Sequence, residues 1–303
     1  MHMIDFSNQV KKQLTRHLSE GQRVELSSVW KNNGIKEEAL SIVEPGINVS
    51  PTIYLEPFYK RFQNGESIQT LADEIFEIHK SCSKQQSLDI TSFTAYQHAK
   101  KRIVYKLVNY EQNRELLEKI PHRRYLDLAI VYYYIFEDSV MENATILLHN
   151  SHLKMWNVTE EEVYKTACKN TPKLLPASIV GMHELLKNML GEVPLEEETG
   201  DLCPMYVMTN DHKMNGAATM TYPHVIRDFA ESIGENMFII PSSVHELILV
   251  PETGTERGFL NDMVREVNET QVDPKEVLAD HVYFYDRKED HISLCVRESV
   301  EYC

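Results

Sequence analysis

The sequence lacks the local signatures of the common phosphate-binding and metal-binding proteins. Only 11 of its 303 residues are glycine, and neither a Walker loop nor a Gly-x-Gly-x-x-Gly motif occurs. Phosphate cradles built on glycine backbone are therefore not expected. The 13 histidines are scattered along the chain without a His-Glu-x-x-His motif. The sequence thus supports no metal site, and no cofactor is predicted.

Cysteines are few, and long apolar runs are missing. The five cysteines form no Cys-x-x-Cys pair, so we expect reduced, mostly buried thiols. No apolar run approaches the roughly 20 residues that cross a bilayer. The first residues, MHMIDFSNQVKKQLTRHL, are amphipathic and lack the apolar core of a signal peptide. We therefore expect a cytoplasmic protein without membrane contact.

Basic residues are outnumbered, 31 against 46 acidic ones, which gives a net charge of −15. A broad duplex-binding face needs clustered Lys and Arg, so direct nucleic-acid binding is not expected. Because acids and bases are mixed along the whole chain, the charge indicates a solubilising surface. The alternative is an acidic partner or mimic for a nucleic-acid-binding protein.

The most regular stretch covers residues 205–251 and predicts strand, turn, strand, helix, strand, turn, strand. An Asn-Gly turn at 33–34 predicts an early hairpin, and residues 281–285 and 291–296 predict a late one. Hairpins followed by helices indicate an α+β fold with mainly antiparallel sheets flanked by helices. We expect two packed parts, an N-terminal part at 1–120 and a C-terminal part at 121–303 that holds the central sheet, with a linker at 191–200.

Three further segments give element predictions that can be checked directly. The apolar run YLDLAIVYYYIF at 125–136 predicts one strand buried on both faces. Thr159, followed by three glutamates, predicts a helix start, which Pro172 and Pro176 are expected to break. Residues 178–190 predict a further helix.

The densest polar turn, PSSVHE at 241–246, holds a nucleophile, a base and an acid. In a strand, Ser243 and His245 point to the same side with Cβ atoms about 6–7 Å apart, whereas Glu246 points to the other side. A Gly-x-Ser-x-Gly elbow is absent. The favoured interpretation is a turn whose hydroxyls satisfy backbone groups. The alternative is a hydrolase-like site with Ser242, Ser243, His245 and Glu246 as catalytic candidates.

Three residues outside this turn are candidates for ligand binding, or for completing a site with it. Asn210 and Asn215 lie in the loop at 209–216, which can line a pocket or form a plain turn. His281 follows Asp280 at the start of a predicted strand. An Asp next to a His is common by chance, so the pair alone does not define a site.

Several segments together resemble an uncharacterised bacterial family, domain of unknown function 5688: NVSPTIYL at 48–55, FQNG at 62–65, HRRYLDLA at 122–129, IIPSSVHE at 239–246 and MVREVN at 263–268. More loosely, the order of elements is similar to domain of unknown function 1444. Neither resemblance implies an activity or catalytic residues. The first implies a position near mobile-element genes, and hence a role in element maintenance or host interaction, which is an associational expectation.

The leading hypothesis is a non-enzymatic cytoplasmic protein that binds a protein or small ligand. It depends on the absence of a metal cluster, a phosphate loop and a nucleophile elbow. The hydrolase-like enzyme and the acidic partner stay as alternatives. The sequence predicts neither the identity of the ligand or partner nor the oligomeric state.

Overall fold

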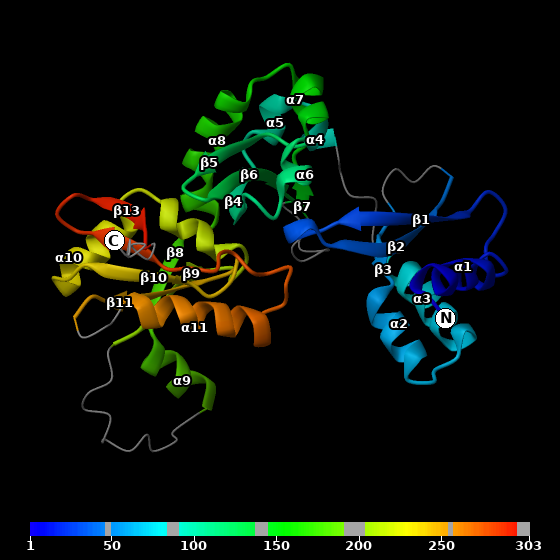
Figure 1. The fold of residues 1–303 in the computed structure, drawn as a ribbon. Coiled ribbons are helices and arrows are strands. Elements are labelled where there is room, and N and C mark those ends of the chain that lie inside the picture. Colours follow the sequence, from blue (N-terminus) through cyan, green and yellow to red (C-terminus); the bar gives the residue numbers. More distant parts are fainter. Residues whose placement is uncertain (46–49, 84–90, 137–144, 191–203, 254–256, 296–303) are drawn as a thin grey trace, which may run out of the picture. The chain divides into compact units, whose positions relative to one another are not determined.

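A computed structural model describes residues 1–45, 50–83, 91–136, 145–190, 204–253 and 257–295 (Figure 1). The predicted linker at 191–200, together with Cys203 and Cys303, lies outside these ranges. The chain divides into a first compact unit of residues 1–92 and a second that begins at Phe93. The sequence placed this boundary after residue 120. A cut there would separate Ile103 from its strand partner Tyr134.

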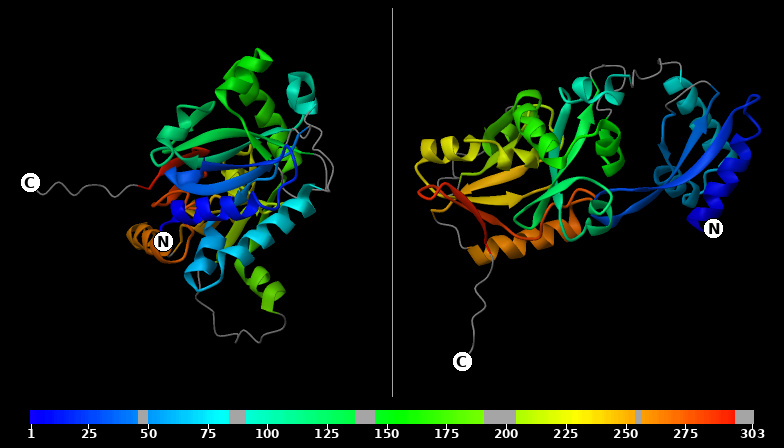
Figure 2. Two further views of the ribbon diagram at one scale, coloured as in Figure 1. Left: turned by 90° about the vertical axis from the view of Figure 1, so that its right-hand side faces the viewer. Right: turned by 90° about the horizontal axis from the view of Figure 1, so that it is seen from above.

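The first unit packs helices against one face of a small antiparallel sheet with the strand order β1-β2-β3 (Figures 1 and 2). Its elements are α1 (Met3–Leu14), β1 (Arg23–Trp30), η1 (Asn32–Gly34), β2 (Lys36–Val43), β3 (Ile53–Tyr54), α2 (Glu56–Gln63) and α3 (Ile68–Ser83). Buried apolar side chains of both layers form one core, including Phe6, Leu40 and Ile75. The predicted hairpin is confirmed, and its turn holds Asn33 at φ 59°.

The second unit opens with a four-stranded antiparallel sheet in the order β4-β6-β5, with β7 also paired to β6. Its elements are α4 (Thr91–Thr94), α5 (Tyr96–Ala99), β4 (Ile103–Asn109), α6 (Arg114–Leu117), β5 (His122–Tyr125), β6 (Leu128–Ile135), β7 (Thr145–Leu147), α7 (Asn150–Trp156) and α8 (Glu160–Leu174). Seven of the eight β6 residues are buried. The strand therefore lies in the interior, as its apolar sequence predicts.

A six-stranded antiparallel sheet completes the second unit, in the order β13-β12-β10-β11-β9-β8. Its elements are β8 (Ala177–Gly181), α9 (Met182–Leu190), β9 (Tyr206–Asn210), η2 (Gly216–Thr221), α10 (Val225–Ile233), β10 (Met237–Pro241), β11 (Leu247–Pro251), α11 (Arg257–Thr270), β12 (Tyr283–Asp286) and β13 (His291–Leu294). Every strand pairing in the described ranges is antiparallel. The predicted α+β class is confirmed.

The two faces of the six-stranded sheet have different neighbours. On one face, Phe238 and Val250 pack against Leu260 and Val264 of α11, which lies along the sheet in Figure 1. On the other face, residues such as Ile239 join the main core with side chains of the four-stranded sheet, α8 and α10. The sheet is therefore buried on both sides around β10 and β11.

Helix α8 shows how local sequence sets an element boundary. Thr159 Oγ1 accepts a hydrogen bond from Glu162 N (3.3 Å), and Glu162 Oε2 accepts one from Thr159 N (2.9 Å). This reciprocal pair confirms the predicted helix start. The predicted break at Pro172 is wrong, because α8 continues through it to Leu174.

Two other predictions need correction. The run at 125–136 is not one strand, because β5 ends at Tyr125 and the chain turns through Leu126 and Asp127 before β6 begins. Leu126 adopts φ 54° without being glycine, which hides this turn from the sequence. Residues 178–190 are not one helix, because β8 pairs with β9 before α9 starts.

Within residues 205–251, the strand predicted between the first turn and the helix is instead the 3₁₀ helix η2. None of the helices in the described ranges has both the length and the apolarity to cross a membrane. Of the five cysteines, Cys168 is half-buried and Cys295 is buried, both as free thiols.

Candidate functional site

The turn at 241–246 connects β10 to β11, and its polar side chains contact one another and the turn backbone. Ser243 Oγ accepts a hydrogen bond from His245 N (3.0 Å), and Ser243 N donates to Glu246 O (3.2 Å). Ser242 Oγ donates to Glu246 Oε1 over 3.4 Å. One serine hydroxyl thus serves a backbone amide, and the other contacts the carboxylate.

His245 is held through its ring and its backbone. Its Nδ1 accepts a hydrogen bond from Asn215 N (3.2 Å), and its Nε2 lies 3.7 Å from Glu276 Oε1. Its carbonyl accepts a bond from Thr209 Oγ1 (2.8 Å). Gly216 approaches this contact so closely that a Cβ there would clash with Thr209 Oγ1 and the His245 carbonyl. The turn is therefore clamped against the loop at 209–216.

Asn210 and Asn215, the ligand-binding candidates of that loop, shape its backbone. Asn210 is buried, its Nδ2 donates to Met214 O (2.8 Å), and its Oδ1 accepts from His212 N (3.1 Å). Asn215 adopts φ 54° just before η2. These contacts hold a tight loop and use the amide of Asn210 internally.

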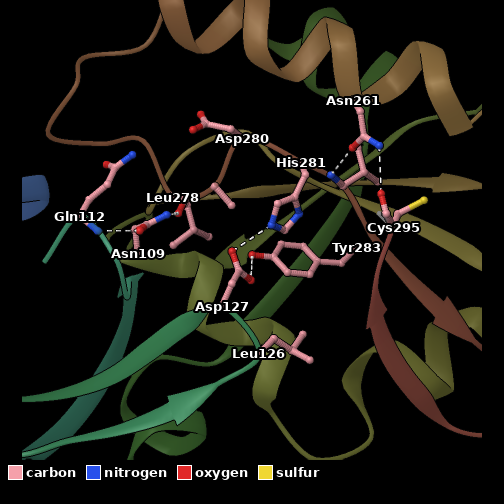
Figure 3. A network of polar contacts seen from close by, with 12 residues as sticks. Asn109, Gln112, Leu126, Asp127, Asn261, Leu278, Asp280, His281, Tyr283 and Cys295 are labelled. Atoms are coloured by element: carbon pink, nitrogen blue, oxygen red, sulfur yellow. Dashed lines mark hydrogen bonds and ion pairs between the residues drawn. The ribbon is translucent and has the colours of Figure 1, made fainter. Parts of the chain in front are cut away.

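His281 lies in a second polar cluster with Asp127 and Tyr283 (Figure 3). Its Nε2 is 2.9 Å from Asp127 Oδ2, and Tyr283 donates its hydroxyl to Asp127 Oδ1, also over 2.9 Å. Asp127 comes from the β5–β6 turn, whereas His281 and Tyr283 belong to the entry and the start of β12. The cluster therefore links the two sheets of the second unit.

The electrostatics of this cluster favour the charged pair. Burial would raise the pKa of Asp127, but its bonds with His281 and Tyr283 outweigh burial and hold that pKa below its ordinary value. Burial likewise opposes charge on His281, yet the Asp127 carboxylate raises the His281 pKa above its ordinary value. Burial and the same carboxylate raise the pKa of Tyr283 far above 10. His281 Nδ1 is buried and has no hydrogen-bond partner.

Asparagines fix the chain on both sides of His281 (Figure 3). Asn261 of α11 accepts a bond from Val282 N (2.8 Å) and donates to Cys295 O (3.0 Å). Asn109, at the end of β4, donates to Leu278 O (3.1 Å). The segment carrying His281 is thus anchored to α11 and to the four-stranded sheet.

The structure places the seven candidate residues of the sequence in two groups. Asn210, Asn215 and the turn residues 242–246 form one group around Gly216, and His281 belongs to the Asp127 cluster. In the described ranges, no Ser, Thr or Cys side chain hydrogen-bonds a ring nitrogen of His245 or His281. Asp127 and Tyr283 were not predicted as site residues, although Asp127 lies within the HRRYLDLA motif.

The described residues form a cavity but no metal-ligating cluster. Within those ranges, no three side chains of His, Cys, Asp or Glu are placed to share a metal ion. A cavity of about 510 Å³ lies beside α7 and the start of α8, and its lining includes no residue of either candidate group. It is lined by Asn150, Leu153, Lys154, Asn157, Val158 and Thr159.

Fold and site together define a two-unit α+β protein whose polar clusters hold backbone segments in place. The chain belongs to a family of unknown function, DUF5688, whose model matches residues 3–287 and so includes most of both units. No curated protein and no solved structure matches it. The looser resemblance to domain of unknown function 1444 stays a prediction.

Proposed function

We propose that this protein is a non-enzymatic binding module that recognises a partner protein through the exposed flank of α11. The observation that carries the proposal is the exposure of two large apolar side chains there, Phe259 at 67% and Val267 at 41%. They are eight residues apart, and the half-buried Met263 lies midway between them. Residues at this spacing share one side of a helix.

The side chain of Phe259 contributes little to the packing of the fold, because it is mostly exposed. The inward side of α11 is anchored by Leu260 and Val264 in an apolar cluster and by the buried Asn261. Exposed aromatic side chains on a rigid element are typical anchors of protein interfaces. At 3.6 residues per turn, Phe259 and Val267 lie beside Leu260 and Val264, which supports a contact surface along the exposed flank of the helix.

The charges around the apolar row indicate the chemistry of the partner. Within residues 259–270 of α11, Asp262, Glu266 and Glu269 are exposed, against one exposed base, Arg265. The whole chain carries −15. A partner with an apolar pocket rimmed by Lys or Arg complements this surface. Nucleic-acid-binding proteins carry such basic rims, so the acidic-partner hypothesis is one form of the same proposal.

The contacts of the turn at 241–246 support binding over hydrolysis. A serine hydrolase needs a serine hydroxyl that donates to the histidine ring. Here Ser243 Oγ accepts from the His245 backbone, and His245 Nδ1 accepts from Asn215 N. A hydrolase at this turn would need both contacts to rearrange.

We further propose that the protein acts in the bacterial cytoplasm, in maintenance of a mobile element or in its interaction with the host. The support is the acidic composition of the sequence and the resemblance described above. The partner would accordingly be encoded by the element or by its host.

The test compares wild type, a Phe259→Glu/Val267→Glu variant and a Lys288→Glu control, which makes the same change in net charge at an exposed residue of the β12–β13 turn. Proteins captured from native lysate are identified by mass spectrometry, and the affinity of a purified partner is measured by calorimetry. Truncation of an interface anchor commonly costs about 2 kcal/mol, so we expect an affinity loss of about 30-fold or more. The control should bind like wild type.

Circular dichroism establishes that each variant is folded. Equal partner affinity for a folded double variant would contradict the role of α11. Labelling of Ser242 or Ser243 by a fluorophosphonate, abolished by His245→Ala, would instead favour the hydrolase and overturn the non-enzymatic assignment.

A further inference from the structure

Strand β1 forms an open edge of the first unit's sheet. Among the described strands, it pairs only with β2. The ladder begins with the bond from Lys31 N to Ile35 O, so hydrogen bonding to β2 alternates from that pair along the strand. By this alternation, the N–H and C=O groups of Val24, Leu26 and Ser28 point away from β2. None of these three residues has a backbone hydrogen bond on that side within the described ranges.

Strand β2 shows the same alternation of inward and outward backbone groups. Glu38, opposite Ser28, turns its carbonyl away from β1 and accepts a bond from Leu55 N (2.9 Å). The outward groups of β2 therefore serve the next strand. The outward groups of β1 have the same geometry, and no strand in the described part of the chain lies beside them.

The edge strand β4 in the second unit differs from β1, because side chains bond to its outward backbone groups. Its outward Tyr105 N donates to Thr171 Oγ1 (3.1 Å), and its outward Ile103 carbonyl accepts from Asn170 Nδ2 (2.9 Å). Side chains of α8 thus cap the backbone of β4. At eight residues, β1 is also long for an uncapped edge.

Strand β1 lacks the usual protection against edge pairing. It contains no proline and no lysine, and all eight residues pair in regular register with β2, without a bulge. Its two charged side chains, Arg23 and Glu25, bond to each other over 2.7 Å. Residues 26–30 carry no charge at all.

We propose that β1 pairs antiparallel with β1 of a second copy of this chain, which joins two three-stranded sheets into one. Leu26 would lie on the two-fold axis and exchange both backbone bonds with Leu26 of the second copy. Val24 would exchange its bonds with Ser28 of the second copy, and Ser28 with Val24. Such an interface is self-complementary, as a two-fold symmetric dimer requires.

Side-chain charges select this register among its neighbours. With Leu26 on the axis, Arg23 lies opposite Val29 of the second copy, and Glu25 lies opposite Ser27. Moving the two-fold axis from Leu26 to Glu25 places the two copies of Glu25 opposite each other. Moving the axis to Ser27 places Arg23 opposite Lys31 of the second copy. Like charges directly opposite destabilise a strand pair, so the register centred on Leu26 is favoured.

The main test uses Ser28, whose side chain is exposed. Ser28→Pro removes an outward N–H that the β1–β2 ladder does not use, and Ser28→Ala keeps that N–H as the matched control. Sedimentation of the full-length chain over a concentration series gives the dimer dissociation constant. We expect Ser28→Pro to weaken the dimer by about tenfold or more, because each half of the interface loses a hydrogen bond. Ser28→Ala should match wild type.

Ser27 tests the register by the sign of a charge effect. Ser27→Lys places a base opposite Glu25 of the second copy and should strengthen the dimer. Ser27→Glu places an acid there and should weaken it. With two such pairs per dimer, the change is about fivefold in either direction. In the register with Glu25 opposite itself, Ser27 would face Arg23 and both effects would reverse.

The proposal concerns the first unit and is independent of the α11 surface. A chain that stays monomeric up to millimolar concentration would overturn it. So would a dimer whose dissociation constant is the same for folded Ser28→Pro and Ser28→Ala variants. Reversed effects at Ser27 would refute the register centred on Leu26.

Discussion

The pair of Asp127 and His281 is expected to make the stability of the second unit depend on pH. The His281 pKa is raised in the folded state, so its contribution is fully present below about pH 6.5 and is lost as pH rises through the folded value. The Asp127 pKa is lowered, so its contribution is present above about pH 3.9 and is lost as pH falls through the folded value. Both contributions are complete between about pH 4 and 6.5.

The size of the effect follows from the contacts of Asp127. Asp127→Asn leaves one acceptor oxygen for two donors, His281 Nε2 and the Tyr283 hydroxyl. One donor is then unsatisfied, which costs about 1–3 kcal/mol. The lost ion pair adds less than a fully buried pair would, because the His281 and Asp127 side chains are 26% and 24% exposed. We expect a destabilisation of about 2–3 kcal/mol at pH 5.5, and a smaller one at pH 9, because His281 loses its charge as pH rises through its raised pKa.

The assay uses the two tryptophans, Trp30 in the first unit and Trp156 in the second. In a Trp30→Phe background, fluorescence reports on the second unit alone, because Trp156 is buried there and donates its indole N–H to Phe93 O. Urea unfolding is followed at pH 5.5 and at pH 9. Asp280→Asn is the control, since it removes a neighbouring charge and leaves the Asp127–His281 bond intact.

The prediction fails if Asp127→Asn costs the same at both pH values, or if it costs less than about 0.5 kcal/mol at pH 5.5, the size of an ordinary surface substitution. A His281→Gln variant should remove most of the difference between the two pH values. If that difference survives in His281→Gln, another titrating group is responsible.

The remaining predictions concern packing and buried hydrogen bonds. Gly216→Ala should destabilise the fold by about 3 kcal/mol, because a Cβ at this position has no space. A Cβ at Gly181 meets nothing within 4 Å, so the control Gly181→Ala should change stability by no more than about 0.5 kcal/mol. Thermal unfolding compares the two variants, and equal melting temperatures would refute the clash at Gly216. Asn261→Ala should cost about 2–3 kcal/mol, because it removes the side-chain bonds to Val282 N and Cys295 O. Hydrogen exchange at the Val282 amide checks this change, and an unchanged protection factor would contradict it.

Elements with strong local signals were predictable from the sequence. The turns between β1 and β2 and between β12 and β13 carry Asn, Gly and Asp, and the start of α8 carries a capping pair. In each case a few neighbouring residues determine the conformation, so no tertiary contact is needed to recognise it.

Elements that depend on distant partners were not predictable. The β5–β6 turn has Leu126 at positive φ, where a sequence interpretation expects glycine. Residues 178–181 form a strand only because β9 lies beside them. Tertiary pairing overrides local propensity in both places.

The contacts of the candidate site residues were not predictable either, because they join residues far apart in the sequence. His281 could be selected as an unusual residue, but its partner Asp127 lies 154 residues earlier in the chain. No local spacing encodes such a pair. The contacts of His245 with Asn215 and Thr209 likewise require the fold, since 30 and 36 residues separate them.

The strand order of the second unit has a consequence for biosynthesis. Its core joins residues from Phe93 onwards to Tyr283 and Tyr285, so it cannot close before nearly the whole chain has been made. The core of the first unit is complete with Ile75. At about 5–20 residues per second, the ribosome needs roughly 10–40 s to proceed from the start of the second core to β12. During that interval the apolar strand β6 lacks its final cover, which makes it a target for chaperones.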